Sequence, residues 1–238
     1  MSYVKQDPGN QPSVEPVSLA EMKEHLRLVG TSLDATVGLL IHAAREVAEG
    51  WMGRSFVKKG YIQTLDAFPA YTQAAQSQAA YPPSYYSLPR YGTAWLNYSQ
   101  MIKLFYGPLV SVESIRYLGT DGAWHTLTGT DISVYNTGLS TGFVFDSVSL
   151  PPRIFPVPGS YWPAALYAPN SVEIHYTSGY SDDASEVPGA DKMLIRLLAA
   201  AWFEHPESER SSNVNDAPMG VQSIVWAGRV VNEAPTRG

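Results

Sequence analysis

The sequence predicts an α+β fold, in which a small helical core carries a large and mostly antiparallel β insertion. Apolar residues recur with helical spacing in residues 17–60 and again in residues 187–205. Between these ranges the apolar residues alternate with polar ones, and Gly and Pro separate the short alternating runs. We therefore expect a core formed by a helix pair and a later helix, with residues 61–186 inserted as a β domain.

The first helical segment, VSLAEMKEHLRL (17–28), carries a complete start signal. Ser18 and Glu21 have the spacing of a capping box, and Val17 and Met22 that of a hydrophobic staple. A helix of about three turns is marginal alone in water, so it must pack on the segment that follows. Residues 1–16 are polar and rich in proline, and we expect a flexible N-terminal arm there.

The second helical segment extends to Gly53, a residue type that commonly ends helices. Thr31 or Ser32 is the expected cap, because both side chains can accept a backbone hydrogen bond. The apolar positions from Val37 to Trp51 form a wide stripe. We expect this stripe to face a later helix that ends near Trp202.

The β insertion is expected to contain short strands joined by hairpins. Runs at 61–69, 101–109, 111–119 and 171–180 are predicted strands, and Asp121-Gly122 predicts a hairpin after the third. Residues 131–136 and 142–146 are predicted to form a second hairpin. Two long loops, 69–100 and 147–170, are biased toward Tyr, Ala and Pro, and such loops often bind partners.

The C-terminal part begins with a helix over 187–205, apolar on most sides and therefore enclosed on most sides. Residues 206–238 are predicted to be a tethered tail with a short apolar helical pattern. The candidate docking residues there are Val221, Ile224, Val225, Trp226 and Arg229. A helix this short either folds back on its own subunit or docks on a partner.

The composition excludes several classes of protein. The 238 residues include no cysteine, so disulfide scaffolds and thiolate chemistry are absent. The net charge of −6 argues against a protein that grips nucleic acid through its backbone charge. There is no apolar run of membrane-spanning length and no signal-peptide pattern, so no membrane partner is expected.

The sequence contains no recognisable catalytic, metal or cofactor constellation. His25, His42, His125, His175 and His205 show no metal-ligand spacing. Acidic residues at 182, 183 and 186 lack the EF-hand pattern and fit a solvated loop before a helix. We therefore expect neither an enzyme nor a cofactor. The loop aromatics could still contact a partner through Tyr81, Tyr85, Tyr86, Tyr91 and Trp95.

The order of several segments carries a family resemblance. They are SLAEMKEHLRL (18–28), AAREVAEGWMGRSF (43–56), PLVSVESIRY (108–117), VEIHYTSGY (172–180), AWFE (201–204) and PMGVQSIVWAGR (218–229). This series resembles the head–tail connector family of tailed bacteriophages and gene transfer agents, whose members are head-completion adaptors. The resemblance does not extend to residues 70–100, where the family has a shorter connection.

The resemblance implies a structural virion protein, made in the host cytoplasm and placed at the head–tail interface. Such adaptors form a ring, commonly of twelve copies, under the portal protein, and the ring offers a platform for the next neck or tail-completion protein. DNA passes through the channel without sequence-specific binding. The resemblance also favours docking of the tail helix on the portal or on an adjacent subunit.

Two alternatives stay open. One is a different virion adaptor, in tail completion or the baseplate. The other is a glycan-binding or hydrolytic β domain that uses the loop aromatics, and hydrolysis would also need a pair of carboxylates beside them.

Overall fold

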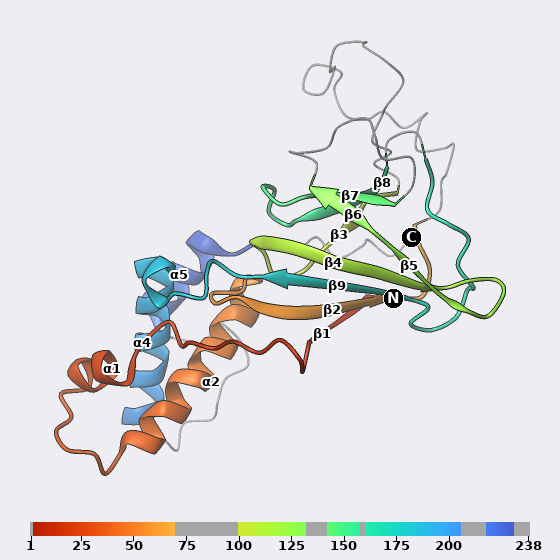
Figure 1. Cartoon of the computed structure of the whole chain (residues 1–238). Coiled ribbons are helices and arrows are strands. Elements are labelled where there is room, and N and C mark those ends of the chain that lie inside the picture. The colour runs from red at the N-terminus through yellow and green to blue at the C-terminus, as the bar shows by residue number, and fades with distance from the viewer. Residues whose placement is uncertain (1, 70–99, 132–141, 158–159, 206–217, 231–238) are drawn as a thin grey trace, which may run out of the picture. The chain divides into compact units, whose positions relative to one another are not determined.

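The computed structural model describes residues 2–69, 100–131, 142–157, 160–205 and 218–230, and its chain divides into two compact units. The helical unit takes residues 7–60, 105–110 and 178–238. The β unit takes residues 1–6, 61–104 and 111–177. Helices and mostly antiparallel sheets coexist, which confirms the predicted α+β class (Figure 1).

The helical unit consists of α1 (Leu19–His25), α2 (Asp34–Met52), α4 (Gly189–Glu204) and α5 (Met219–Gly228), with a 3₁₀ turn η3 (Ala184–Glu186) before α4. Helix α2 packs against α1, α4 and α5, and α4 also packs against α5 (Figure 1). No helix in the described ranges is long and apolar enough to cross a membrane.

The start of α1 matches the prediction. The Glu21 N–H donates to Ser18 Oγ over 3.2 Å, and the Ser18 N–H donates to Glu21 Oε2 over 2.8 Å. Val17 and Met22 are both fully buried, so both partners of the expected staple lie in the core. Capping therefore sets where α1 begins and brings its apolar face onto α2.

The start of α2 differs from the prediction. Leu33 occupies the cap position and no side chain accepts a hydrogen bond there, so neither Thr31 nor Ser32 is the cap. The Lys23 ammonium lies 2.6 Å from the Asp34 carboxylate and links α1 to the first turn of α2. At the other end Gly53 has φ +64°, the left-handed conformation that favours glycine.

The core of the helical unit forms where the apolar faces of the helices meet. Its fully buried members include Val37, Ala44, Ala48, Leu194, Ile195, Val221 and Val225. Trp51 and Trp202, predicted to close the apolar stripes, are only partly buried and pack against the margin of this core. Met193 lies on the helix that the sequence predicted to be enclosed on most sides, but its side chain is 41% exposed.

A buried ionic cluster lies in the same unit, centred on Glu49 of α2. Glu49 Oε2 accepts from Lys59 Nζ over 2.5 Å and from Arg45 Nη1 over 3.1 Å, while Glu49 Oε1 accepts from the Phe56 N–H over 2.7 Å. Arg45 also donates to Glu15 over 2.7 Å, and His42 contacts the same carboxylate. The cluster joins α2 to the segment before α1 and to the start of β2.

The pKa shifts in this cluster reflect burial opposed by pairing. Burial lowers the pKa of Lys59, although the Glu49 charge acts against the shift. Burial also acts to lower the pKa of Arg45, but Glu15 and Glu49 outweigh it and the pKa is raised. At Glu15 burial acts to raise the pKa, and the Arg45 and His42 contacts reverse this and lower it.

The β unit contains two sheets. The larger has the strand order β1-β2-β9-β4-β5, from β1 (Ser2–Gln6), β2 (Lys59–Leu65), β9 (Val172–Ser178), β4 (Leu109–Leu118) and β5 (Trp124–Leu127). The smaller has the order β3-β8-β7-β6, from β3 (Ile102–Lys103), β8 (Arg153–Pro156), β7 (Phe143–Asp146) and β6 (Gly129–Asp131). Burial alternates over residues 172–176 of β9, and β4 and β5 form the hairpin predicted at Asp121-Gly122, whereas Thr177 and Ser178 at the end of β9 are both buried.

Three sequence predictions in the β unit are wrong. Residues 2–6 were expected in a flexible arm, but they form β1 and pair antiparallel with β2. The predicted hairpin of 131–136 with 142–146 is replaced by parallel pairing of β6 with β7, which a tight turn cannot connect. Residues 153–156, expected in a loop, form β8 antiparallel to β7.

The first prediction concerns the charge at the centre of the cluster. Glu49→Gln keeps an oxygen that can accept from the Phe56 N–H but leaves Lys59 buried without its counter-charge. We expect the free energy of unfolding to fall by about 3 kcal/mol in urea denaturation. Glu46→Gln, an exposed carboxylate on the same helix, is the matched control and should shift it by less than about 0.5 kcal/mol. Equal effects would contradict a central role for Glu49.

The second prediction concerns pH. Because the pKa of Glu15 in the folded protein lies below its usual value of 4.5, its contribution to stability is present above that pH and is lost on acidification through the folded-state pKa. Glu15→Gln should therefore be less stable than the parent at neutral pH, and the deficit should shrink at about pH 3. A deficit that does not change with pH would contradict an ionic role for Glu15.

Candidate functional site

The candidate docking residues of the tail lie on α5, and the structure separates them into two groups. Val221 and Val225 are fully buried in the core of the helical unit, and Ile224 packs against that core. Trp226, by contrast, is 59% exposed, and Arg229 is exposed as well. Of the two possibilities for this short helix, its apolar stripe folds back on its own unit.

Helix α5 is seated by close backbone contacts. A Cβ added at Gly228 would lie 2.6 Å from Met52 Cε and 2.8 Å from Arg54 Nη2, so glycine permits this approach. The Val230 N–H then donates to the Met52 carbonyl oxygen over 2.9 Å. At the opposite end, Gly220 lies against Leu197 of α4. Truncation before α5 would therefore remove part of the unit's core.

A second buried ion pair lies beside the end of α5. Arg54 Nη2 donates to Asp191 Oδ1 over 3.1 Å, and Arg54 Nη1 donates to the Tyr180 hydroxyl over 2.8 Å. Asp191 lies in the first turn of α4 and is 1% exposed, and burial raises its pKa despite the Arg54 charge. Gly228 and Asp191 thus both contact Arg54, and α5 runs back toward the start of α4.

The outer side of α5 presents the residue types typical of binding hot spots. The Arg229 guanidinium lies 5.8 Å from the centre of the Trp226 ring, within range of a cation–π contact. Met219, at the first turn, is 85% exposed. Trp226 and Arg229 are thus held at the exposed side of a helix whose other side is fixed in the core.

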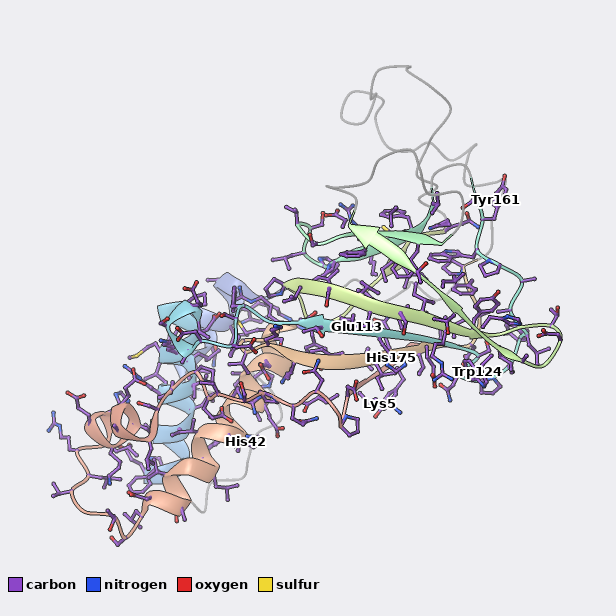
Figure 2. The ribbon with its side chains drawn as sticks, viewed as in Figure 1. Lys5, His42, Glu113, Trp124, Tyr161 and His175 are labelled. Atoms are coloured by element: carbon purple, nitrogen blue, oxygen red, sulfur yellow. The ribbon has the colours of Figure 1, made fainter. Side chains whose placement is uncertain are left out.

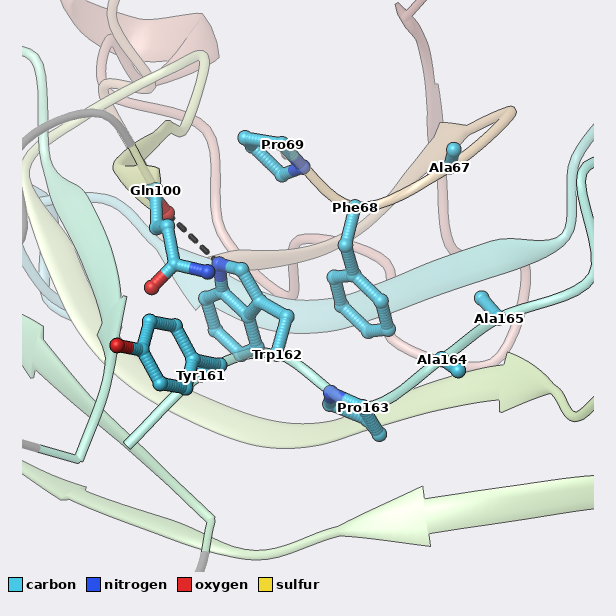
Figure 3. A pocket seen from close by; sticks show the side chains of 9 residues that line it. All are labelled: Ala67, Phe68, Pro69, Gln100, Tyr161, Trp162, Pro163, Ala164 and Ala165. Carbon is cyan, nitrogen blue, oxygen red and sulfur yellow. Dashed lines mark hydrogen bonds between the residues drawn. The ribbon is translucent and has the colours of Figure 1, made fainter. Parts of the chain in front are cut away.

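The β unit carries a shallow aromatic groove that the sequence did not reveal. Its volume is about 470 Å³ (Figure 3). Its lining consists of Ala67, Phe68, Pro69, Gln100, Tyr161, Trp162, Pro163, Ala164 and Ala165. Here we call these nine residues the aromatic groove. In the sequence, an aromatic residue precedes a proline at Phe68-Pro69 and again at Trp162-Pro163. This repeated dipeptide is a signal that could have indicated the groove.

The walls of the aromatic groove are held by stacking and by one hydrogen bond. Phe68 and Trp162 stack with ring centres 4.9 Å apart and planes 5° from parallel. The Trp162 Nε1–H donates to the Gln100 carbonyl oxygen over 2.7 Å (Figure 3). Tyr161 is 60% exposed at the rim and is labelled in Figure 2. None of the nine lining residues carries a charge.

The other sequence candidates fall into ordinary structural roles. Asp182 pairs with Lys58 over 3.0 Å, and Asp183 accepts from the Ser185 N–H to start η3, so they act in local structure. His42 lies on α2 beside Glu15, and His175 lies on β9 (Figure 2). Among the residues that the structure describes, no three His, Asp or Glu side chains gather as a metal site would need. Tyr81, Tyr85, Tyr86, Tyr91 and Trp95 lie outside the described ranges.

Comparison with known proteins gives likeness of fold without likeness of sequence. No protein-family model matches the chain, and no curated protein sequence matches it. A chain from the neck of an empty GTA particle computed with C6 symmetry aligns with 99% of this chain and 100% of its own, with TM-score 0.63 and 19% identity.

Two further solved structures show the same likeness. A chain from the virion of a native gene transfer agent (GTA) particle aligns over 99% of both chains, with TM-score 0.66 and 18% identity. A chain from the neck of a native GTA particle computed with C12 symmetry aligns over 99% of this chain and 100% of its own, with TM-score 0.59 and 20% identity. At this level of identity the comparisons establish a shared fold over the whole chain.

Proposed function

We propose that this protein is a structural component of the neck of a phage-like particle or gene transfer agent. In this proposal it forms a ring under the portal protein, extends the DNA channel and connects the head to the next neck or tail protein. The observation that carries the proposal is the likeness of fold to GTA neck chains, which spans both units and nearly every residue of each chain.

The charge of the protein is consistent with DNA passing through a channel rather than binding to it. The net charge of −6 gives no general attraction for a phosphate backbone. Three basic side chains are also paired with carboxylates inside the protein. Arg45 and Lys59 are each 1% exposed and pair with Glu49, and Arg54 pairs with Asp191. In a ring of such subunits these three cations would not be available to DNA moving through it.

The chemistry of the described surfaces supports a role in assembly rather than catalysis. The aromatic groove offers no acid, base or nucleophile beyond the Tyr161 hydroxyl. The buried ionised groups Arg45, Lys59 and Glu49 of the helical unit are paired with one another in positions that hold the fold. We therefore propose a non-catalytic, cofactor-free protein that acts through its surfaces, with Trp226 and Arg229 of α5 as the contact to the portal or to an adjacent subunit.

Two rival functions remain to be tested beside this one. A different virion adaptor would share the fold but occupy another ring in the particle, and a map of the particle neck with this chain fitted would distinguish them. A glycan-binding β domain is favoured by one observation, the stacked Phe68 and Trp162 beside exposed Tyr161. Titration of the protein with oligosaccharides, followed by Trp fluorescence, tests that role directly.

The third prediction separates docking from folding on α5. Trp226→Ala removes an exposed ring, so the melting temperature should stay within about 1 °C of the parent, while docking loses on the order of 2 kcal/mol. In a phage or particle system that lacks this gene, the variant should yield fewer tailed, DNA-filled particles. Undiminished numbers of tailed particles would remove Trp226 from the interface.

Val225→Ala is the matched variant on the inner side of the same helix. It truncates a fully buried side chain, and we expect the free energy of unfolding to fall by about 2 kcal/mol. Any loss of particles with Val225→Ala should follow the loss of stability and recover at lower temperature. The loss with Trp226→Ala should not recover, because it removes a contact and leaves the fold intact.

A further inference from the structure

The turn between β7 and β8, residues 147–152, is held by a single carboxylate. The Val148 and Ser149 N–H groups each donate to Asp146 Oδ1 over 3.1 Å. The Ser149 hydroxyl and Arg153 Nη2 each donate to Asp146 Oδ2 over 2.6 Å. Burial acts to raise the pKa of Asp146, but these donors outweigh it and the pKa is lowered, so the carboxylate stays ionised at neutral pH. We call residues 147–152 the β7–β8 turn, and its conformation is set before any partner binds.

The β7–β8 turn presents two aliphatic side chains to solvent. Val148 is 84% exposed, and Leu150 is 50% exposed. Single exposed aliphatic residues are ordinary, but two of them on one locked turn can be buried together with little loss of backbone entropy. The charge at the base of the turn is already paired, because Asp146 lies 2.6 Å from Arg153. A surface that covers this turn should therefore be apolar and uncharged.

The aromatic groove of the same unit is such a surface. None of its lining residues carries a charge. Its volume is about 470 Å³, and the stacked rings of Phe68 and Trp162 form one wall, with Tyr161 at the rim (Figure 3). Contact of Val148 and Leu150 with these rings would remove apolar surface of both partners from water. The turn and the groove therefore match in polarity and in their lack of charge.

Strand β8 separates the β7–β8 turn from the groove. The turn ends before Arg153, the first residue of this strand, whereas lining residues 161–165 follow Pro156, the last one. A strand of four residues spans about 13 Å, and the chain leaves its two ends in opposite directions (Figure 1). The turn of one chain thus points away from the groove of the same chain, so a contact between the two surfaces joins two copies.

We propose that Val148 and Leu150 of one copy dock in the aromatic groove of the next copy. Because the turn and the groove are different surfaces, the contact runs head to tail, and such contacts repeat in one direction until a ring closes. A second copy is the favoured occupant because the same chain carries a rigid, neutral and apolar turn that its own groove does not cover. The inference rests on the ring assembly proposed above, and it names the surfaces that join neighbouring subunits.

Cysteine cross-linking tests the contact, because the chain has no cysteine of its own. Leu150→Cys places a thiol on the turn, and Ala164→Cys places one on an exposed part of the groove lining. The two purified variants, one of which carries a mass tag, are mixed with oxidised glutathione. Mixed covalent dimers should form roughly tenfold faster than dimers of either variant alone, because docking holds the two thiols together.

The matched control replaces the turn variant with Ala35→Cys, at an exposed position on α2. Its mixture with Ala164→Cys should form mixed dimers no faster than either variant forms dimers by itself. Equal rates for the turn mixture and the control mixture would overturn the docking. Faster dimers from Leu150→Cys alone than from the turn mixture would assign the turn to the same turn of a second copy, which also overturns it.

A second measurement changes the turn without adding cysteine. Val148→Ser with Leu150→Ser keeps Asp146 and its donors, so the melting temperature should not change, while sedimentation should show self-association weakened by about tenfold or more. Val29→Ser, at a 98% exposed position of the helical unit, is the matched control and should leave self-association unchanged. Unweakened association of the double variant would overturn the docking. The function proposed above fails separately, if a map of the particle neck shows no ring of this protein.

Discussion

The helical unit depends on the carboxylate of Glu49 and the charges buried around it. Glu49 has three donors, from Lys59, Arg45 and the Phe56 N–H, which come from the same helix and from the segment that leaves it. Desolvating these charges is expensive, so the cluster contributes to stability only while every member is present. Because loss of one member would leave an uncompensated buried charge, we expect the cluster to favour one arrangement of the chain around the end of α2.

The position of α5 follows from the same end of α2. Helix α2 ends at Gly53, and the next residue, Arg54, donates hydrogen bonds to Asp191 and Tyr180. Gly228 of α5 packs against Met52 and Arg54. Because Val221 and Val225 complete the core, the side of α5 that carries Trp226 is held at a fixed place on the surface. A tail that contributes to its own core can thus also present a rigid contact, and folding and docking are not exclusive for this helix.

In the β unit, the segment around Trp162 is held by aromatic stacking. Trp162 lies in a segment without a regular strand, and its ring is kept in place by Phe68 and by the Gln100 carbonyl oxygen. Phe68 also contacts Tyr117 of β4 edge-on, with ring centres 5.7 Å apart, and Tyr117 stacks on His125 of β5. The groove is therefore continuous with the larger sheet, and its shape is set by the sheet rather than by the loop alone.

The sequence by itself determined the local features of this protein. Features that depend on neighbouring residues were predicted correctly. They are the capping box at Ser18, the end of α2 at Gly53, the Asp121-Gly122 hairpin and the alternation over residues 172–176 of β9. The α+β class followed from the order of such features. Of the docking candidates, local hydrophobic spacing identified α5 as a helix but could not say which residues would be exposed.

Only the tertiary structure decided the features that depend on distant residues. Residues 2–6 become β1 because β2, some sixty positions away, offers an edge, and β6 pairs parallel with β7 through a connection longer than any turn signal. Val221 was a docking candidate until the faces of α2 and α4 were seen to bury it. The aromatic groove likewise joins Phe68 to Trp162 across the sequence. Such long-range contacts leave no periodic trace in the chain, because burial is a property of the assembled fold.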